Sequence, residues 1–472
     1  MSDLSIRRAK IVATLGPSSA NPAMIRELIE AGVDVLRINS SHGDPNEWTQ
    51  WMGWVREQAA ANERHVGLLV DLQGPRIRVG TLSAPRTLNA GERVTLVPEA
   101  AAASGDVPVT YDELPSDVAP GSRILIDDGI IVAEVEQVDG RRVHTIVRHG
   151  GVLRSQKGIN LPGVQVSAST VTDRDREMIE IAVRHGVDFL GISFVRRAED
   201  VHAVRAMVPR DVRLVAKIEK AAAMTDIQRI LEACDVLMVA RGDLGVELPF
   251  EEVPLAQKRL IRLANRHARP VITATQMLES MVQNPRPTRA EASDVANAIL
   301  DGTDAVMLSA ETAMGQYPLK AVQAMARIIR QIERSLGDLP LARRRPAAQA
   351  DTVSVDDAIA HATSVAAEQL RVPVIVCLTK SGFTARKISA HRPVPPIVGL
   401  STDPETCRYL SIVWGVVPLL VQDAPTYEAM LANARDLLVA RGMVKPGDRI
   451  AVTAGVPFEV PGTTNLLRIE SV

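Results

Sequence analysis

The stretch VDFLGISFVRRAEDVHAVRAMVPRDVRLVAKIE, residues 187–219, contains the pattern that decides the fold. It opens with an apolar run, Val187–Ser193, passes through a helix-like segment, and closes with a second apolar run, Arg213–Glu219. Each run ends in polar residues. Continuous apolar strands that alternate with amphipathic helices are typical of a parallel sheet covered on both faces. The stretch therefore predicts one β-α-β unit of such a sheet.

The same unit recurs from the N-terminus to about residue 340. The predicted strands are Lys10–Thr14, Val33–Asn39, His65–Leu72, Val187–Ser193, Arg213–Glu219, Asp235–Arg241, Pro270–Gln276 and Asp304–Glu311. Eight strands that alternate with helices predict an α/β fold built on a closed (β/α)8 barrel, a TIM barrel.

The pattern breaks after the third predicted strand, where short segments of alternating hydrophobicity are separated by turns such as Asp139-Gly140. The strands predicted in this part are Arg93–Val97, Arg123–Ile126, Ile130–Gln137 and Arg142–Arg148. They indicate a small antiparallel β-barrel domain, residues 75–166, inserted into a strand-to-helix loop. An insertion at that end of a barrel strand would cover the mouth of the barrel and could act as a lid.

A third part follows the last predicted barrel helix, which ends near Leu336-Gly337. Pro340–Ala350, which contains three consecutive arginines, is a candidate linker. Beyond it we predict a helix, Asp356–Leu370, and the strands Val372–Leu378, Pro396–Leu400, Gly415–Val421, Arg449–Val452 and Leu466–Ile469. These predict a separate three-layer α/β domain. The predicted domains are thus a barrel from residues 1–74 and 167–339, an insert from 75–166, and a C-terminal domain from 340–472.

Composition narrows the class of protein. The 472 residues suggest about three domains at ~150 residues each. A net charge of −2 and only 3% aromatic residues argue against a nucleic-acid or membrane-surface partner. The three cysteines stand far apart, which fits a reducing cytosol. Met1–Gly16 lacks a signal-peptide pattern, and Tyr409–Val421 is too short and interrupted to span a membrane, so a cytoplasmic protein is expected.

Polar residues follow the predicted barrel strands at the ends where barrel enzymes carry their chemistry. They read Arg37-Ile38-Asn39-Ser40-Ser41-His42, Asp71-Leu72-Gln73, Ser193-Phe194-Val195-Arg196, Lys217-Ile218-Glu219, Ala240-Arg241-Gly242-Asp243, Thr275-Gln276 and Ser309-Ala310-Glu311. Because the carboxyl ends of parallel strands meet at one rim, these residues predict a single composite site.

Lys217 and Glu219 are the most informative of these residues. They are two positions apart on a strand and therefore share a face. One interpretation is an ion pair that plugs the barrel, although a buried pair is a poor source of stability. The alternative is chemical: Glu219 and Asp243 lie on neighbouring predicted strands, and Mg²⁺ is usually held by one or two carboxylates with substrate oxygens and water. Lys217 would then neutralise a transferring phosphoryl group.

Two further stretches suit an anionic ligand. Arg37, with Asn39 and Ser41, offers a cation beside small polar groups, unless it only caps a neighbouring helix. Arg241–Gly245 has glycines that let the backbone approach a ligand, unless it is a plain turn. The chain contains no GxxxxGK[ST], HExxH or GxSxG motif, so a bound nucleotide would not lie on a Walker-type loop.

Several strings of the sequence, in this order, resemble the pyruvate kinase family. The most specific are Arg37–Gly43, Met238–Glu247 (MVARGDLGVE), Ala274–Met281 (ATQMLESM), Pro285–Asp301 (PRPTRAEASDVANAILD) and Ser309–Ala313. The likeness covers nearly the whole chain. It implies a barrel, a lid inserted after the third strand, and a C-terminal effector domain. It also implies a homotetramer.

The resemblance implies phosphoryl transfer from phosphoenolpyruvate to ADP, which gives pyruvate and ATP. Arg37 and Lys217 would contact the phosphoryl group. Glu219 and Asp243 would hold Mg²⁺ or Mn²⁺. Gly242, Asp243 and Thr275 would bind the substrate carboxylate, with Thr275 near the proton relay to the enolate. Positions that match nucleotide contacts are His42 and Arg78, and those that match monovalent-cation ligands are Asn39, Ser41 and Asp71.

Within that pattern, this chain departs at one stretch that bears on the monovalent cation and agrees at a loop of the C-terminal domain. Where many members read Asp-Thr-Lys-Gly-Pro-Glu, this sequence reads Asp71-Leu72-Gln73-Gly74-Pro75-Arg76. We expect the Arg76 guanidinium to replace the monovalent cation, so that potassium is not required. The loop with Thr379, Lys380, Ser381, Gly382 and Thr384 matches the family's effector loop and combines hydroxyls with a helix N-terminus, which suits a phosphorylated effector; an ordinary strand–helix turn is the alternative.

Two other functions remain open from the residues alone. The first is a Mg²⁺-dependent barrel lyase that acts through a pyruvate enolate with the same Lys, Glu and Asp chemistry, without an ADP site or a lid. The second is a catalytically silent paralogue that only binds an effector. The presence of Lys217, Glu219, Asp243 and Thr275 argues against the silent paralogue.

Overall fold

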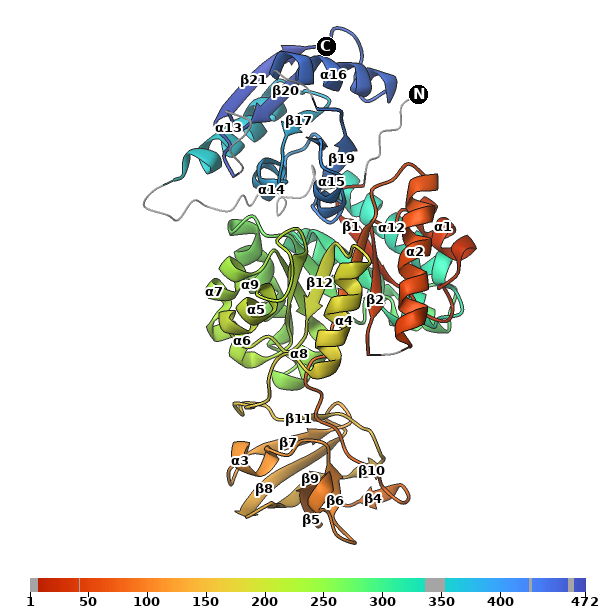
Figure 1. The fold of residues 1–472 in the computed structure, drawn as a ribbon, viewed down its shortest axis with the longest axis vertical. Coiled ribbons are helices and arrows are strands. Elements are labelled where there is room, and N and C mark those ends of the chain that lie inside the picture. The colour runs from red at the N-terminus through yellow and green to blue at the C-terminus, as the bar shows by residue number, and fades with distance from the viewer. Residues whose placement is uncertain (1–6, 42, 336–352, 424–426, 457–461) are drawn as a thin grey trace.

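The computed structural model describes residues 7–41, 43–335, 353–423, 427–456 and 462–472. The predicted linker, Pro340–Ala350, and His42 lie outside these residues. Figure 1 shows three bodies in a row, with the barrel between a β-rich insert and a C-terminal α/β body. Among the described helices, none combines the length and the apolar character needed to cross a bilayer.

The middle body is a closed barrel of eight parallel strands, as predicted from the apolar runs. In chain order the strands are β1 (Lys10–Thr14), β2 (Val35–Asn39), β3 (Gly67–Asp71), β12 (Phe189–Ile192), β13 (Arg213–Ile218), β14 (Val236–Ala240), β15 (Val271–Ala274) and β16 (Ala305–Leu308). β1 pairs with both β2 and β16, which closes the ring. Side chains such as Phe189 and Met238 are fully buried, which explains why the strands read as unbroken apolar runs.

Helices surround the barrel and bury one face each. The longer ones are α1 (Pro22–Ala31), α2 (Pro45–Ala61), α4 (Asp173–Arg184), α5 (Ala198–Arg205), α7 (Ile227–Ala233), α9 (Val253–Arg266), α10 (Arg289–Asp301) and α12 (Pro318–Ser335). Shorter ones are α6 (Ala221–Thr225), α8 (Arg241–Glu247), η2 (Glu279–Val282) and α11 (Ala310–Ala313). Thr172 and Thr288 cap α4 and α10 by accepting backbone N–H groups, which fixes where these helices begin.

Four aspartates repeat around the end of the barrel where the strands begin. We call Asp34, Asp188, Asp235 and Asp304 the aspartate ring. Every second strand of the barrel is directly preceded by one of these aspartates. The carboxylate of each accepts a backbone N–H from the preceding barrel strand in the chain. The N···O distances are 2.9 Å from Ile11 to Asp34, 2.8 Å from Leu68 to Asp188, 2.9 Å from Leu214 to Asp235 and 3.0 Å from Val271 to Asp304. The ring therefore satisfies N–H groups that the parallel sheet leaves open at that end.

Every carboxylate of the ring also binds an arginine. The pairs within the barrel body are Arg7–Asp34, Arg56–Asp188 and Arg205–Asp235. The C-terminal body supplies Arg392 to Asp304 at 3.0 Å and Arg408 to Asp188 at 2.6 Å. These two pairs fasten the C-terminal body to the barrel.

The insert leaves the barrel after β3 and returns before β12. Its main sheet has the order β11-β7-β8-β9-β5-β6. The strands are β5 (Arg93–Pro98), β6 (Val107–Val109), β7 (Arg123–Ile126), β8 (Ile131–Asp139), β9 (Arg142–His149) and β11 (Ile159–Asn160), and β4 (Arg86–Leu88) pairs separately with β10 (Gly151–Leu153). A 3₁₀ turn η1 (Glu99–Ala101) and a short helix α3 (Leu114–Asp117) complete it.

The entering chain closes this sheet into a small barrel. Arg78 bridges to Gly158 beside β11, and Val79 bridges to Val109 of β6, so one short segment joins the two edge strands. The expected antiparallel arrangement is wrong at one place, because β5 and β6 are parallel. The crossover through η1 returns the chain alongside Leu96–Pro98, the second half of β5, so β6 runs in the same direction as β5.

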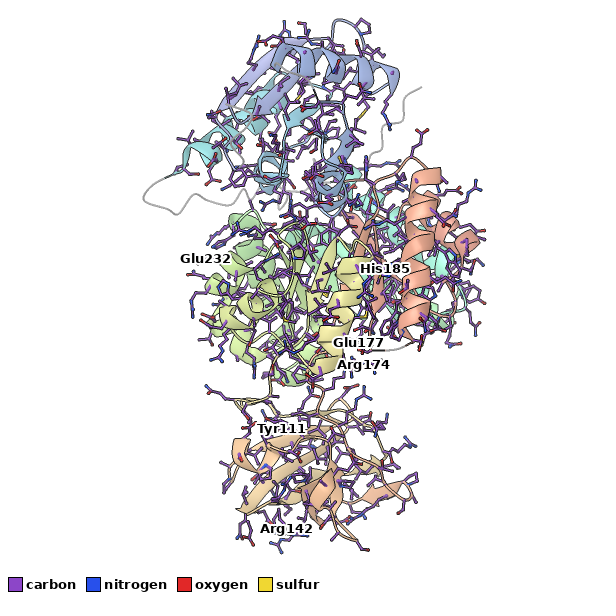
Figure 2. The ribbon with its side chains drawn as sticks, in the orientation of Figure 1. Tyr111, Arg142, Arg174, Glu177, His185 and Glu232 are labelled. Carbon is purple, nitrogen blue, oxygen red and sulfur yellow. The ribbon has the colours of Figure 1, made fainter. Side chains whose placement is uncertain are left out.

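The C-terminal body is a five-stranded sheet of order β19-β18-β17-β20-β21. Its elements are α13 (Val355–Gln369), β17 (Ile375–Leu378), α14 (Phe383–Ala390), β18 (Ile397–Ser401), α15 (Pro404–Leu410), β19 (Val416–Leu420), α16 (Tyr427–Ala440), β20 (Arg449–Ala454) and β21 (Leu466–Ser471). All neighbouring strands are parallel except β20 and β21. Figures 1 and 2 show this body at the end of the barrel opposite the insert.

Candidate active site

Lys217 lies at the centre of the barrel mouth. It is the next-to-last residue of β13, and its side chain is only 12% exposed. Nζ donates to Ser193 Oγ at 2.7 Å and lies 2.8 Å from Glu219 Oε1 and 3.2 Å from Asp71 Oδ1. Burial alone lowers the pKa of Lys217, but the charges of Asp71 and Glu219 outweigh it and raise this pKa above its usual value. The group is therefore a fixed ammonium ion.

Arg37 reaches the same carboxylate from the neighbouring strand β2. Its Nε and Nη2 lie 2.9 Å and 2.6 Å from Asp71 Oδ2, and Nη1 donates to Thr14 Oγ1 at 3.0 Å. Burial raises the pKa of Asp71, but Lys217 and Arg37 outweigh this and lower it. Gly191 leaves room for the pair, because a Cβ there would lie 2.6 Å from Asp71 Oδ1. One ionised carboxylate thus orients two cations.

Glu219 and Asp243 are the carboxylates predicted to hold a metal. Glu219 is 2% exposed and accepts the backbone N–H of Phe194 at 2.8 Å. Burial, followed by the negative charge of Asp243, raises the pKa of Glu219, although Lys217 opposes the shift. A nearby cation would reduce the electrostatic repulsion between the Glu219 and Asp243 carboxylates.

The donor set decides which kind of metal would fit. Within the described part of the chain, no group of three or more His, Cys, Asp or Glu side chains could enclose a metal ion. The described residues therefore do not form the set of three or four side chains that usually binds zinc. Mg²⁺ and Mn²⁺ are usually held by one or two carboxylates together with substrate oxygens and water, so the buried Glu219 and the exposed Asp243 fit the predicted cation by the chemistry of their side chains.

Gly242 and Thr275 meet across two elements of the rim. The N–H of Gly242, in the first turn of α8, donates to Thr275 Oγ1 at 2.8 Å. Thr275 follows β15 and has a φ of +69°, which is unusual for a β-branched residue. Its hydroxyl donates to the carbonyl of Ala274 at 2.6 Å. The structure thus brings together two of the three residues expected to bind a carboxylate, Gly242 and Thr275.

The residues predicted as monovalent-cation ligands are only partly assembled. Asn39 and Asp71 are partners in the register of β2 and β3, and Asn39 Oδ1 accepts the N–H of Ser41 at 3.2 Å. Arg76 is exposed. Among the described residues, no hydrogen bond or ion pair joins its side chain to these three residues. The predicted replacement of a cation by Arg76 is therefore not seen in this arrangement.

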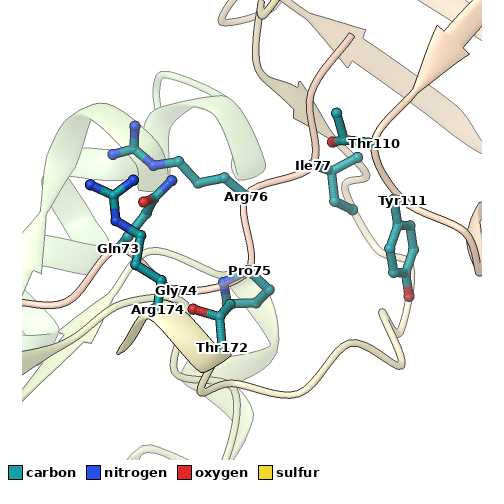
Figure 3. A pocket seen from close by; sticks show the side chains of 9 residues that line it. All are labelled: Gln73, Gly74, Pro75, Arg76, Ile77, Thr110, Tyr111, Thr172 and Arg174. Carbon is teal, nitrogen blue, oxygen red and sulfur yellow. The ribbon is translucent and has the colours of Figure 1, made fainter. Parts of the chain in front are cut away.

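Arg76 instead lines a cavity of about 380 Å³ between the barrel and the insert. Figure 3 shows Arg76, Gln73 and Arg174 on one side of it, with Thr110 and Tyr111 across the gap. Arg78 follows on the same segment, and burial together with the charge of Arg76 lowers its pKa. His42 lies outside the described residues.

Arg174 is a candidate that the sequence reasoning missed. It is the second residue of α4, where the helix dipole disfavours a positive charge. That mismatch was the available signal, because a cation in the first turn of a helix suggests an anionic ligand nearby. The cavity at the hinge of the insert therefore carries two arginine side chains, Arg76 and Arg174.

The predicted effector loop joins β17 to α14. Gly382, with a φ of +77°, is the N-cap of the helix. Thr379 N donates to Leu400 O at 3.0 Å, and Lys380 O accepts from Thr406 Oγ1 at 2.7 Å. Lys380 is exposed and Ser381 half-buried, whereas the Thr384 hydroxyl is buried against Thr464 Oγ1 at 2.9 Å. The fold itself engages the Thr384 hydroxyl.

The fold is a multidomain (β/α)8 barrel, and its mouth combines the fixed cations Arg37 and Lys217 with the carboxylates of Glu219 and Asp243. The family model described as "Pyruvate kinase, barrel domain" matches residues 6–322, and "Pyruvate kinase, alpha/beta domain" matches residues 357–470. The chain belongs to the pyruvate kinase family.

Individual relatives agree along the whole chain. It is 44% identical to pyruvate kinase 2 of Synechocystis, over 99% of this chain and 79% of the relative. It is 44% identical to the pyruvate kinase of Geobacillus stearothermophilus, over 99% of this chain and 80% of the relative. A crystal structure of a pyruvate kinase from Cryptosporidium parvum has a TM-score of 0.93 and 34% identity, and the match covers 100% of this chain and 98% of the other.

Proposed function

We propose that this enzyme transfers the phosphoryl group of phosphoenolpyruvate to ADP and releases pyruvate and ATP. The observation that carries the proposal is the fixed Lys217 ammonium at the barrel mouth, held by Asp71, Glu219 and Ser193. In the reaction the bond between phosphorus and the enolate oxygen breaks, and one forms to the terminal phosphate oxygen of ADP. Lys217 and Arg37 would face the charge that spreads over the transferring group.

The opposite end of the substrate would bind at α8 and the turn after β15. Gly242, Asp243 and Thr275 are proposed to receive the substrate carboxylate. The enolate left by phosphoryl transfer must gain a proton on carbon to become pyruvate. The Thr275 hydroxyl, which accepts from Gly242 N and donates to Ala274 O, lies beside that position in this proposal and would form part of the proton relay.

Glu219 and Asp243 are proposed to hold Mg²⁺ or Mn²⁺. When bound, such a cation supplies positive charge to phosphoryl and enolate oxygens. The role of the chain is to keep both carboxylates at the mouth: Phe194 N orients Glu219, and α8 positions Asp243.

The nucleotide is proposed to bind on the insert side of the mouth, where Arg78 and His42 were predicted to contact it. The cavity between barrel and insert supports this position, because Arg76 and Arg174 line it and phosphate groups suit guanidinium partners. Closure of the insert over the mouth would then bring the two substrates together and exclude water.

A coupled assay tests the reaction against its alternatives. Pyruvate release is followed by its reduction with lactate dehydrogenase, with ADP and Mg²⁺ supplied or withheld. We expect pyruvate only when phosphoenolpyruvate, ADP and Mg²⁺ are all present. Pyruvate release that does not depend on ADP would support the barrel lyase, and no release at all would support the silent paralogue.

Potassium is proposed to be unnecessary. Asp71 is already paired with Arg37 and Lys217, and Arg76 stands on the segment that would move with the insert. We expect substantial activity in buffer free of sodium and potassium, with little gain when potassium is added. Arg76→Glu should lower kcat by about tenfold or more, because it reverses the charge that is proposed to stand in for the monovalent cation.

Two comparisons sharpen the potassium test. Potassium should restore part of the activity of Arg76→Glu, whereas Arg174→Glu, altered on the same side of the same cavity, should not respond to potassium. A parent enzyme that is inactive without potassium would contradict the proposal. Initial rates in tetramethylammonium buffer with added KCl provide the measurement.

A phosphorylated metabolite is proposed to activate the enzyme through Thr379, Lys380, Ser381 and Gly382, with Thr384 acting only through the fold. Ser381→Asp should abolish activation, because the added carboxylate repels a phosphate group. Ser381→Ala, which removes the hydroxyl without adding charge, should keep part of it. Initial rates measured with sugar phosphates and AMP check this, and a parent enzyme that responds to none of them would contradict it.

The assembly and location implied by the family stay predictions. We predict that the enzyme forms a homotetramer, is located in the cytoplasm and needs no nucleic-acid or membrane partner. Sedimentation velocity of the purified enzyme tests the tetramer directly.

A further inference from the structure

The turn after β15 has an unusual backbone. Thr275 and Gln276 are consecutive residues with φ values of +69° and +54°. Neither is glycine, and Thr275 is β-branched, so both are in a region that side chains disfavour. Strained backbone of this kind persists only where the surroundings over-determine it. The question is which group holds this turn.

Arg241 holds the turn from α8. Its Nη2 donates to the carbonyl of Thr275 at 2.7 Å, and its Nε donates to the carbonyl of Ala274 at 3.3 Å. The same Nη2 lies 2.8 Å from Met277 Sδ. One planar guanidinium therefore contacts residues 274, 275 and 277, on both sides of Gln276, which a lysine ammonium cannot do.

Arg241 is itself fixed by two further helices. Its Nη1 lies 2.7 Å from Asp294 Oδ1 on α10 and 3.5 Å from Gln257 Oε1 on α9. The side chain is 12% exposed. Arg241 also directly precedes Gly242, whose N–H meets the Thr275 hydroxyl at 2.8 Å. A single residue thus sets both sides of that contact.

We propose that Arg241, anchored by Asp294, is a positioning residue that holds the Ala274–Thr275 peptide so that the Thr275 hydroxyl stays within hydrogen-bond reach of the Gly242 N–H, next to the position proposed for the ligand carboxylate. This inference rests on the proposed function, in which these two groups bind phosphoenolpyruvate. Without the guanidinium, the turn relaxes toward negative φ and the hydroxyl leaves Gly242. Substrate binding weakens, while the cations at Lys217 and Arg37 stay in place.

The first test is Arg241→Lys, which keeps the charge and loses the planar fork. We expect the KM for phosphoenolpyruvate to rise about tenfold. The KM for ADP should not change, because the nucleotide is proposed to bind on the other side of the mouth. Asp294→Asn should shift the same KM less, and Arg262→Lys, an exposed arginine of α9, serves as the matched control. Equal changes in both KM values, or no change in either, would overturn the proposal.

The second test restores the turn by another route. Glycine adopts positive φ without strain, so Gln276→Gly in the Arg241→Lys background should recover most of the lost affinity. Gln276→Ala shortens the same exposed side chain but keeps its Cβ, and it should not. If Gln276→Gly and Gln276→Ala behave alike, strain in the turn is not what Arg241 controls.

Hydrogen exchange separates this inference from the proposed reaction. Amides of residues 275–278 should exchange faster in Arg241→Lys than in the parent, and Gln276→Gly should slow them again. Unchanged exchange would overturn the role of Arg241 whatever the enzyme catalyses. Altered exchange in an enzyme that fails the coupled assay would retain the positioning role and reject phosphoenolpyruvate as the ligand.

Discussion

Lys217→Met is expected to lower kcat by about 10²–10³-fold, which corresponds to about 3–4 kcal/mol of transition-state stabilisation. The methionine keeps an unbranched side chain of similar length and removes the ammonium that contacts both Asp71 and Glu219. Asp71 stays paired with Arg37, so the site should keep its shape. The loss should therefore fall on turnover and leave substrate affinity largely intact.

Steady-state kinetics and calorimetric binding of phosphoenolpyruvate separate these effects. The melting temperature of the variant shows whether the fold is retained. Lys258→Met, which removes a surface lysine paired with Asp301, is the matched control and should keep its turnover. Turnover of Lys217→Met close to that of the parent would remove Lys217 from the mechanism.

Glu219→Gln and Asp243→Asn should each raise the metal concentration needed for half-maximal activity by at least about 10–100-fold, the range seen even for groups behind the ligands. Each change removes one of the two negative charges at the mouth while keeping the size of the side chain. Glu219→Gln should have the larger effect, because Glu219 is buried and Asp243 is exposed.

Binding of Mn²⁺, followed by electron paramagnetic resonance, gives a readout that does not depend on turnover. Glu251→Gln, an exposed neighbour of α8, provides the control and should bind Mn²⁺ like the parent. If the Mn²⁺ titrations of Glu219→Gln and Asp243→Asn overlay that of the parent, these residues do not hold the metal.

The barrel could be predicted because its strands are buried on both faces. Leu214, Val215 and Ala216 of β13 are each fully buried, so this part of the strand is an unbroken apolar run that can be recognised in the sequence. The insert was harder to predict. β11 has only two residues, and its environment depends on Arg78 and Val79, which lie far away in the sequence. Local patterns contain no signal for such closure.

The site residues, like the strands, could be predicted only where the local sequence carries a signal. Lys217 and Glu219 could be identified because charged residues on a barrel strand conflict with an apolar core. Arg174 was missed because a single cation in the first turn of a helix is a weak signal, and its position on the cavity at the hinge of the insert depends on the folded arrangement. The role of Arg241 was also out of reach, since its contacts lie on three other segments, after β15, on α9 and on α10. Backbone strain at Thr275 leaves no trace in composition.

The aspartate ring gives the barrel a mechanical property. In the closed order of strands, β12 and β16 lie on opposite sides of the ring, and they are the strands that Asp188 and Asp304 precede. Arg408 and Arg392 of the C-terminal body hold these two aspartates. The C-terminal body therefore holds the barrel at two opposite points, so a rotation of that body about the barrel axis would twist the barrel and would not bend it. The same two strands lead into Ser193 and Ser309 on the rim, and Ser193 accepts from Lys217 at 2.7 Å, so the strands that the C-terminal body holds at one end of the barrel carry residues of the candidate site at the other.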